Sequence, residues 1–250
     1  MSTDSQNPVR KSCAQPHSCS QEVRLKAMSR SPLTKDLNQL EYLELDKSLT
    51  AWSWAEDDPL YLAGENLNGS YLIVAGRVRV SRDTIDGKEL TVDIATPGDV
   101  IGAIDTEPQP AVDSAWAIET TCALFLPATA LATVIEQHPS FALAMIRMQQ
   151  QRLATARDHE INLTTTTVEQ RVAIAVRTLG RKIGQRRPDG ILLIQVRIRR
   201  EDVAGLAGTT VESTSRVLAR LRKEGVIDSG REWIAVVDER QLDAIIGGDF

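Results

Sequence analysis

Residues 200–224 read REDVAGLAGTTVESTSRVLARLRKE, and this stretch decides the fold of the C-terminal part of the chain. Its pattern predicts a short helix over 200–207, a left-handed turn residue at Gly208 and a second helix capped by Thr210. The second helix is expected to run to about residue 224. Two helices joined by so short a turn form a helix-turn-helix. The apolar residues expected to hold the helices together are Val203, Leu206, Val211, Val217 and Leu218.

The second helix of this motif carries polar side chains that suit the edges of base pairs. Arg216 can pair bidentately with guanine, Glu212 can accept from the cytosine amino group, and Ser215 can bond to a base or a phosphate. Residues 196–231 hold eight basic and five acidic residues, a local charge of +3 in a chain of net charge -5. This local charge favours a phosphate partner. The predicted DNA-contacting residues are Arg200, Thr209, Thr210, Glu212, Ser213, Ser215, Arg216 and Arg220.

A β-hairpin wing is expected after the second helix. The apolar runs Gly225–Ile227 and Trp233–Val237 flank Ser229-Gly230, a dipeptide typical of turns. The alternative is an ordinary helical hairpin with an exposed polar face. The order of helix, glycine turn, helix and wing favours a DNA-binding module over that alternative.

Two longer helices are expected before this module. Residues 140–163 contain neither Gly nor Pro and follow Pro139, and Val168–Ile183 forms a second helical pattern before a turn at 188–190. On the first helix, residues at alternating spacings of three and four form one stripe. The stripe suits a dimer seam, and packing against the chain's own barrel is the open alternative. Its members are Ile146, Gln149, Leu153, Ala156, Glu160 and Leu163.

The segment from Trp52 to Pro127 predicts a small β-barrel or sandwich. Short apolar runs alternate with glycines, and Asp86-Gly87 lies between two such runs as a hairpin signal. An enzyme of the cupin type uses a similar barrel but needs metal-binding histidines on its strands. This segment has no histidine, which argues against an enzyme.

Composition limits the remaining possibilities. The chain has 250 residues, 42% hydrophobic and 25% charged, which favours two globular domains. It has no run of about 18 apolar residues and no signal-peptide pattern, so we expect a cytoplasmic protein without a membrane partner. Residues 1–32 are rich in Ser, Gln and basic residues and predict a flexible or ligand-ordered tail.

The order of barrel, long helix and winged helix-turn-helix resembles the CRP/FNR superfamily of bacterial regulators, from about Leu37 to the end of the chain. In the barrel, Gly98-Asp99-Val-Ile-Gly102 looks like the G-D-x-x-G turn of that family. In the DNA module, residues 212–216 match the E-x-x-S-R recognition helix of the FNR branch. The resemblance implies that Glu212, Ser215 and Arg216 read TTGAT half-sites in an inverted repeat.

The resemblance also implies an architecture and partners. The expected fold is α+β, with a cyclic-nucleotide-binding-like barrel (jelly roll), a long dimerisation helix and a C-terminal winged helix-turn-helix. We expect a homodimer that binds double-stranded DNA, works with RNA polymerase, and activates or represses genes of respiration, nitrogen-oxide or redox adaptation. The expected parts are a cysteine-containing tail over 1–34, the sensor barrel over 35–137, the dimerisation helix over 138–165 and the DNA-binding domain over 166–250.

The barrel departs from the cyclic-AMP-binding relatives at two places. Gly102 is followed by Ala103 instead of Glu, and Asp113-Ser114 stands where those relatives have the Arg-Ser pair that grips the cyclic phosphate. Because an Asp repels a phosphate, cyclic AMP is not expected as the ligand.

Three cysteines suggest a redox or metal sensor. The FNR branch holds a [4Fe-4S] cluster with N-terminal cysteines and one barrel cysteine, and this chain has Cys13, Cys19 and Cys122. Three thiolates are one short of a full set, and the C-x-x-C spacing of that branch is absent, so a fourth ligand such as His17 or a carboxylate is required. The alternatives are that Cys122 is a small buried hydrophobe and that the barrel senses a metabolite.

Overall fold

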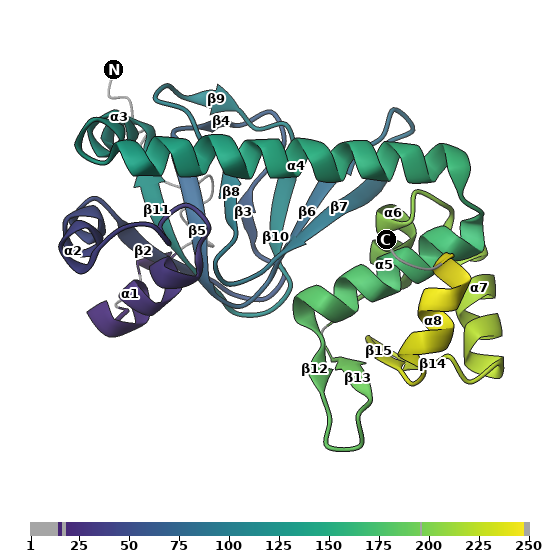
Figure 1. Cartoon of the computed structure of the whole chain (residues 1–250). Helices are drawn as coiled ribbons and strands as arrows, with labels where there is room; N and C mark the ends of the chain where they lie inside the picture. The colour runs from purple at the N-terminus through teal and green to yellow at the C-terminus, as the bar shows by residue number, and fades with distance from the viewer. Residues whose placement is uncertain (1–14, 17–18, 196, 248–250) are drawn as a thin grey trace. The chain divides into compact units, whose positions relative to one another are not determined.

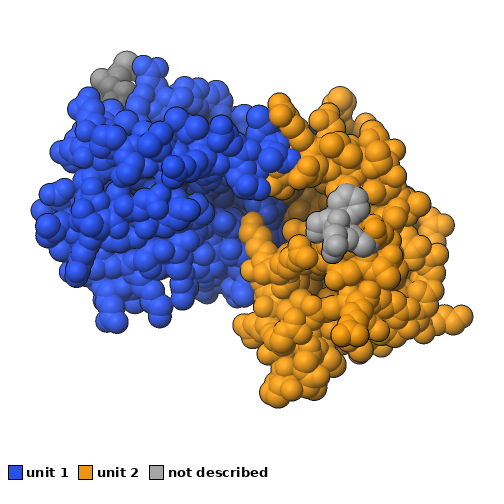
Figure 2. All heavy atoms as spheres, viewed as in Figure 1, with its two compact units in different colours: residues 1–83, 93–154 blue, residues 84–92, 155–250 orange. Residues whose placement is uncertain are grey.

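The computed structural model describes residues 15–16, 19–195 and 197–247, so Cys13 and His17 lie outside the described residues. The chain divides into two compact units (Figure 2). The first comprises Met1–Asp83 and Asp93–Ala154, and the second comprises Thr84–Val92 and Thr155–Phe250.

Antiparallel strands form the predicted barrel-like sandwich (Figure 1). One sheet contains, in spatial order, β1 (Gln15–Pro16), β2 (Thr50–Trp54), β11 (Thr121–Pro127), β5 (Gly69–Ala75) and β8 (Val100–Gly102). The other contains β3 (Pro59–Tyr61), β10 (Ser114–Ala117), β6 (Val78–Asp83) and β7 (Glu89–Ala95). A small third sheet pairs β4 (Asn66–Leu67) with β9 (Gln109–Pro110).

Strand β11 shows why the first sheet is buried on both faces. Successive side chains of a strand point to opposite faces. Ala123 and Phe125 therefore join the aromatic core between the sheets, whereas Cys122, Leu124 and Leu126 join a second apolar cluster. Tyr71 of β5 packs against Phe125 in the first core, with ring centroids 5.0 Å apart.

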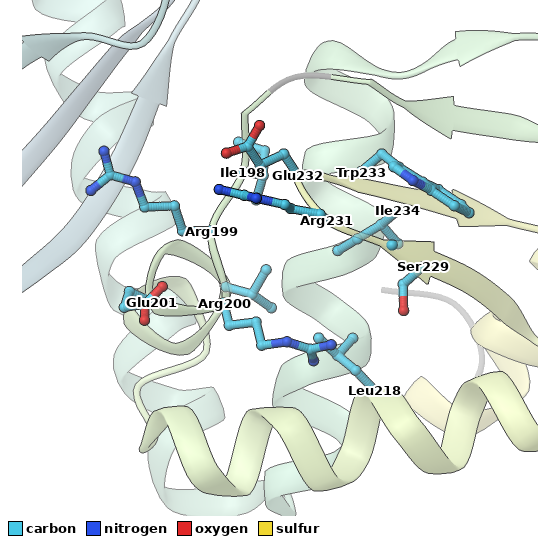
Figure 3. A pocket seen from close by; sticks show the side chains of 12 residues that line it. Ile198, Arg199, Arg200, Glu201, Leu218, Ser229, Arg231, Glu232, Trp233 and Ile234 are labelled. Atoms are coloured by element: carbon cyan, nitrogen blue, oxygen red, sulfur yellow. The ribbon is translucent and has the colours of Figure 1, made fainter. Parts of the chain in front are cut away.

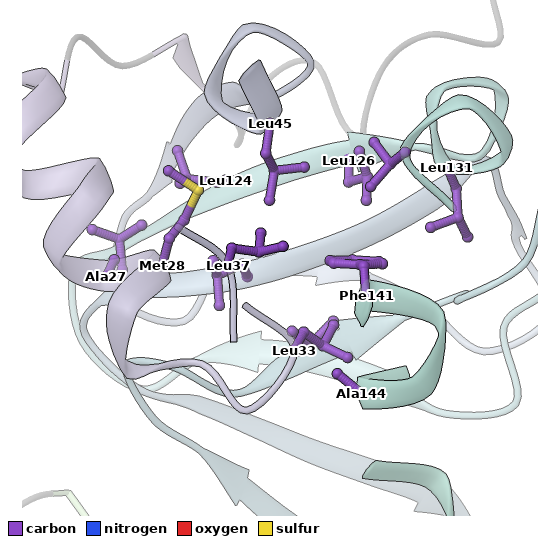
Figure 4. Close-up of a cluster of buried hydrophobic side chains, with 14 of the residues drawn as sticks. Ala27, Met28, Leu33, Leu37, Leu45, Leu124, Leu126, Leu131, Phe141 and Ala144 are labelled. Atoms are coloured by element: carbon purple, nitrogen blue, oxygen red, sulfur yellow. The ribbon is translucent and has the colours of Figure 1, made fainter. Parts of the chain in front are cut away.

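Four helices supply the second cluster (Figure 4). They are α1 (Gln21–Arg30), α2 (Gln39–Lys47), α3 (Ala128–Gln137) and the start of α4 (Pro139–Thr165). Met28 of α1 is fully buried, and Phe141 of α4 is 3% exposed. The prediction of a flexible tail is thus wrong for residues 21–30, which form a packed helix. The predicted long helix over 140–163 is confirmed.

The second unit is a winged helix-turn-helix. Its first complete helix is α5 (Val168–Ile183), as predicted, and the buried Val172, Val176 and Leu179 of α5 anchor the core of the unit. The antiparallel sheet order is β12 (Gln185–Arg186), β13 (Leu192–Ile194), β15 (Trp233–Val236) and β14 (Ile227–Gly230). The remaining helices are α6 (Arg200–Leu206), α7 (Val211–Lys223) and α8 (Glu239–Ile246).

The wing turn lies two residues later than the sequence predicts. Gly230 pairs with Trp233 in the ladder, so the turn consists of Arg231 and Glu232, and Glu232 has a left-handed φ of 66°. The expected turn at Ser229-Gly230 is therefore wrong. Among the described helices, none is long and apolar enough to cross a membrane.

Candidate DNA-binding interface and sensor site

The turn between α6 and α7 has the geometry that the sequence predicts. Gly208 adopts a φ of +57°, and its backbone N–H donates to the carbonyl of Gly205 at 3.0 Å. A Cβ at Gly208 would meet only a terminal methyl carbon of the exposed Leu163 side chain, which can move aside, so the positive φ is the reason for glycine at this position. Thr210 then caps α7, because its Oγ1 accepts the backbone N–H of Ser213 at 3.1 Å.

Helix α7 separates an apolar face from a polar face. Thr214, Leu218 and Leu221 are at most 2% exposed and point into the unit. Glu212 and Arg216 are exposed on the other side of the helix, near its N-terminal end. This is the part of a recognition helix that meets base edges in the major groove.

Glu212 and Arg216 belong to one turn of the helix. Arg216 Nε donates to the carbonyl oxygen of Glu212 at 3.4 Å, which leaves the other guanidinium nitrogens of Arg216 available. Hydrogen bonds from its own backbone N–H and from the Thr210 hydroxyl lower the pKa of Glu212. Glu212 is therefore an ionised acceptor at neutral pH, as a contact to a cytosine amino group requires.

Other predicted DNA contacts already have partners within the second unit. Arg220 forms an ion pair with Glu169 of α5. Thr210 and Ser213 bond to each other, with the two hydroxyl oxygens 3.1 Å apart. Ser215 and Thr209 are half-buried, and Arg200 is exposed at the start of α6.

A cavity of about 240 Å³ lies between α6 and the wing (Figure 3). Arg200 extends toward Leu218 of α7, and Arg231 lines the cavity from the wing. Arg231, which lies in the wing turn, is not among the DNA contacts predicted from the sequence. The available signal was a basic residue two positions before the second apolar run of the hairpin.

The stripe of α4 is exposed in the single chain. Ile146 is 56% exposed and Leu153 is 52% exposed, although both lie in the same unit as the barrel. Gln149 is exposed as well. Packing on the chain's own barrel therefore does not account for these three positions. Farther along the helix, Ala156, Glu160 and Leu163 are also exposed.

The barrel region that resembles a cyclic-nucleotide site contains a chain of two hydrogen bonds. The backbone N–H of Gly102 donates to the Tyr61 hydroxyl at 3.2 Å, and that hydroxyl donates to Asp113 at 3.0 Å. Burial raises the pKa of Asp113 and of Tyr61. The tyrosine ring occupies the interior beside Tyr71, with ring centroids 6.1 Å apart.

Two domain families match the chain. Residues 52–138 match the Cyclic nucleotide-binding domain family, and residues 170–245 match the Crp-like helix-turn-helix domain family. The chain belongs to the CRP/FNR superfamily of transcription regulators. The superfamily members it resembles are regulators, so the prediction that the chain is not an enzyme is confirmed and the cupin-like alternative is wrong.

Individual relatives in the superfamily differ in the signal that their names imply. The Anaerobic regulatory protein of Haemophilus influenzae is 27% identical over 192 residues, which are 75% of this chain and 73% of the relative. The CRP-like cAMP-activated global transcriptional regulator of Mycobacterium tuberculosis is 24% identical over 216 residues, 86% of this chain and 96% of the relative. The structure of FixK2 from Bradyrhizobium japonicum shares the fold, with a TM-score of 0.70, 24% identity, and coverage of 81% of this chain and 99% of that one.

Two of the three predicted metal ligands lie together in the first unit. The Sγ atoms of Cys19 and Cys122 are 3.1 Å apart, and both side chains are buried. Arg24 of α1 holds this position, because its Nη1 donates to the Cys19 carbonyl at 2.9 Å and its guanidinium forms two 2.7 Å hydrogen bonds with Asp46. Burial and the neighbouring Cys19 raise the pKa of Cys122. Sequence reasoning found both thiols and missed Arg24 and Asp46.

Proposed function

We propose that this CRP/FNR-superfamily regulator binds an inverted repeat of TTGAT-like half-sites as a homodimer. The observation that carries the proposal is the exposed pair Glu212 and Arg216 at the start of a correctly capped α7. These residues stand in the E-x-x-S-R pattern of the FNR branch. Arg216 pairs with a guanine, Glu212 with a cytosine, and Ser215 with a base or phosphate. Arg200, Thr209, Thr210, Ser213 and Arg220 bind or orient the DNA backbone around them.

The exposed stripe of α4 is proposed as the subunit seam. Exposed apolar side chains at spacings of three and four along a helix are buried when two such helices pair. Two-fold symmetry then gives two copies of α7, which explains why the site is an inverted repeat. In this proposal the dimer acts in the cytoplasm and meets RNA polymerase at the promoter.

Selection from a pool of randomised duplexes tests the DNA site without assuming it. The expected result is enrichment of an inverted repeat whose halves contain TTGAT. Enrichment of an unrelated sequence, or of a single half without symmetry, would contradict the proposed site. An Arg216→Ala variant serves as the control, because it should enrich sequences that are degenerate at the guanine position.

The proposed signal is redox in nature and acts through the cysteines. A [4Fe-4S] cluster needs four ligands, and the described residues supply only Cys19 and Cys122. No group of three or more His, Cys, Asp or Glu side chains within the described ranges is arranged to hold a metal ion. These residues alone do not fit a cluster, which would also need Cys13 and a non-cysteine ligand such as His17. An absorption spectrum of anaerobically purified protein tests the cluster hypothesis, because iron–sulfur absorbance in the visible range would support it.

A further inference from the structure

The thiols of Cys19 and Cys122 approach each other across 103 positions of sequence. Cys19 immediately precedes the cap of α1, and Cys122 lies on β11 on the face that meets the helices. The two sulfur atoms are in contact at 3.1 Å, and a disulfide requires about 2.05 Å. Closing this gap needs a movement of only about 1 Å.

The surroundings keep the pair in place. On one side, Arg24 binds the Cys19 carbonyl and is itself held by Asp46, whose side chain is 5% exposed. On the other side, Cys122 is fixed in the ladder between Ser53 of β2 and Ala75 of β5. Among the described residues, no further cysteine, histidine or carboxylate lies with this pair in an arrangement that could hold a metal ion. The arrangement suits two thiols that react with each other.

We propose that Cys19 and Cys122 form a reversible intramolecular disulfide that fastens the N-terminal segment to the sensor barrel. The proposal rests on the redox part of the proposed function and names its chemistry as a dithiol–disulfide couple. The oxidant is a small peroxide, which suits a pair of residues that are only 9% and 7% exposed.

The reaction balances with hydrogen peroxide as the two-electron oxidant. The sulfur of one cysteine attacks a peroxide oxygen, the O–O bond breaks, and a sulfenic acid and one water form. The second sulfur then attacks the sulfenic sulfur, the S–O bond breaks, and the S–S bond forms with release of a second water. Both cysteine sulfurs are oxidised and both peroxide oxygens are reduced. A dithiol reductant reverses the step by exchange.

The test uses the full-length protein, its Cys13→Ser variant and its Cys122→Ala variant, each treated with hydrogen peroxide and then with dithiothreitol. Cys13→Ser is needed because tryptic peptide 12–24 contains both Cys13 and Cys19. Free thiols are counted, the non-reduced peptides are identified by mass spectrometry, and the unfolding temperature is recorded. DNA affinity for the TTGAT repeat is measured on the same samples.

The wild-type protein should fall from three free thiols to one, and Cys13→Ser from two to none, with a linked pair of peptides 12–24 and 89–147. The unfolding temperature should rise by roughly 5–10 °C because the closed loop is about 100 residues long, and dithiothreitol should reverse the rise. Cys122→Ala should show no rise. The proposal is overturned if Cys13→Ser keeps both thiols, forms only intermolecular links, or is oxidised to sulfinic acid without a link.

DNA affinity separates this inference from the proposed function. If the link forms and affinity for the TTGAT repeat does not change, the disulfide stands and the redox signal of the proposed function fails. If affinity responds to peroxide equally in Cys122→Ala, the redox signal stands and this disulfide is overturned as its cause.

Discussion

Arg220 on α7 and Glu169 on α5 form an ion pair in the DNA-binding unit, with side chains 49% and 30% exposed. The guanidinium proposed to contact a phosphate is therefore held by a carboxylate in the free protein. Since an exposed pair contributes only about 0–1 kcal/mol, DNA can compete for the arginine.

Removing Glu169 should free this arginine. We expect Glu169→Gln to raise DNA affinity by up to about fivefold on specific and random sequences alike. Arg220→Ala should lower affinity on both and reduce the slope of log affinity against log salt by about 1. Fluorescence anisotropy over a salt series measures both. An effect confined to the TTGAT repeat would show that Arg220 reads bases instead.

Arg216→Ala should act on specificity. Loss of a bidentate guanine contact costs about 1–3 kcal/mol of discrimination at that base pair of each half-site. The measurement compares the affinity of wild-type and variant protein for the repeat and for the same repeat with the guanine replaced. Equal losses on specific and random DNA would remove the base-reading assignment.

The stripe of α4 should control assembly. Leu153→Glu places a charge among apolar side chains in the proposed seam and should shift the protein to monomer. Glu160→Leu removes a like-charge contact between the two subunits and should tighten the dimer. Thr155→Glu is the matched control, because residue 155 lies about 200° around the helix from Leu153. Sedimentation equilibrium that shows the same dimerisation constant for Leu153→Glu and wild type would contradict the seam.

Asp113 should give the barrel a pH dependence. Burial raises the pKa of this carboxyl in the folded protein, so the folded state binds more protons than the unfolded state between about pH 3.9 and the raised value. The contribution of the Asp113 carboxyl to the free energy of unfolding is fully present below that pH window and is lost as pH rises through it. Asp113→Asn should remove the loss and keep an acceptor for the Tyr61 hydroxyl. Unfolding temperatures are measured from pH 3 to 7, and the unfolding temperature of Asp113→Asn relative to the wild type should increase as pH rises. A difference between the two proteins that stays constant with pH would contradict this role of Asp113.

Local signals explain what the sequence could predict. Gly208 must adopt a positive φ and Thr210 must cap α7, and both requirements are visible within a few residues. The absence of Gly and Pro from residues 140–163 is likewise visible in the sequence and predicts one long helix. For this reason the helix-turn-helix and the long helix are found at their predicted positions.

The remaining features depend on contacts that the sequence does not display. Helix α1 is mostly polar, and its contacts through Ala27 and Met28 with the second apolar cluster make it a packed element. The wing turn lies later than predicted because Gly230 still pairs within the strand ladder and Glu232 adopts the left-handed conformation of the turn. The contact between Cys19 and Cys122 spans 103 positions and arises only from the tertiary fold.

The central claim, a two-fold symmetric reader of TTGAT half-sites, is tested most directly by changing the spacing of the two halves. Affinity is measured by anisotropy for the inverted repeat, for the same repeat with five base pairs inserted at its centre, and for a scrambled duplex. Five base pairs rotate one half-site by about half a turn relative to the other. The protein is expected to bind the intact repeat about 1,000-fold or more tighter than the scrambled duplex. The insertion is expected to remove most of this difference in affinity. Equal affinity for the intact and the expanded repeat, or for the intact repeat and the scrambled duplex, would contradict it.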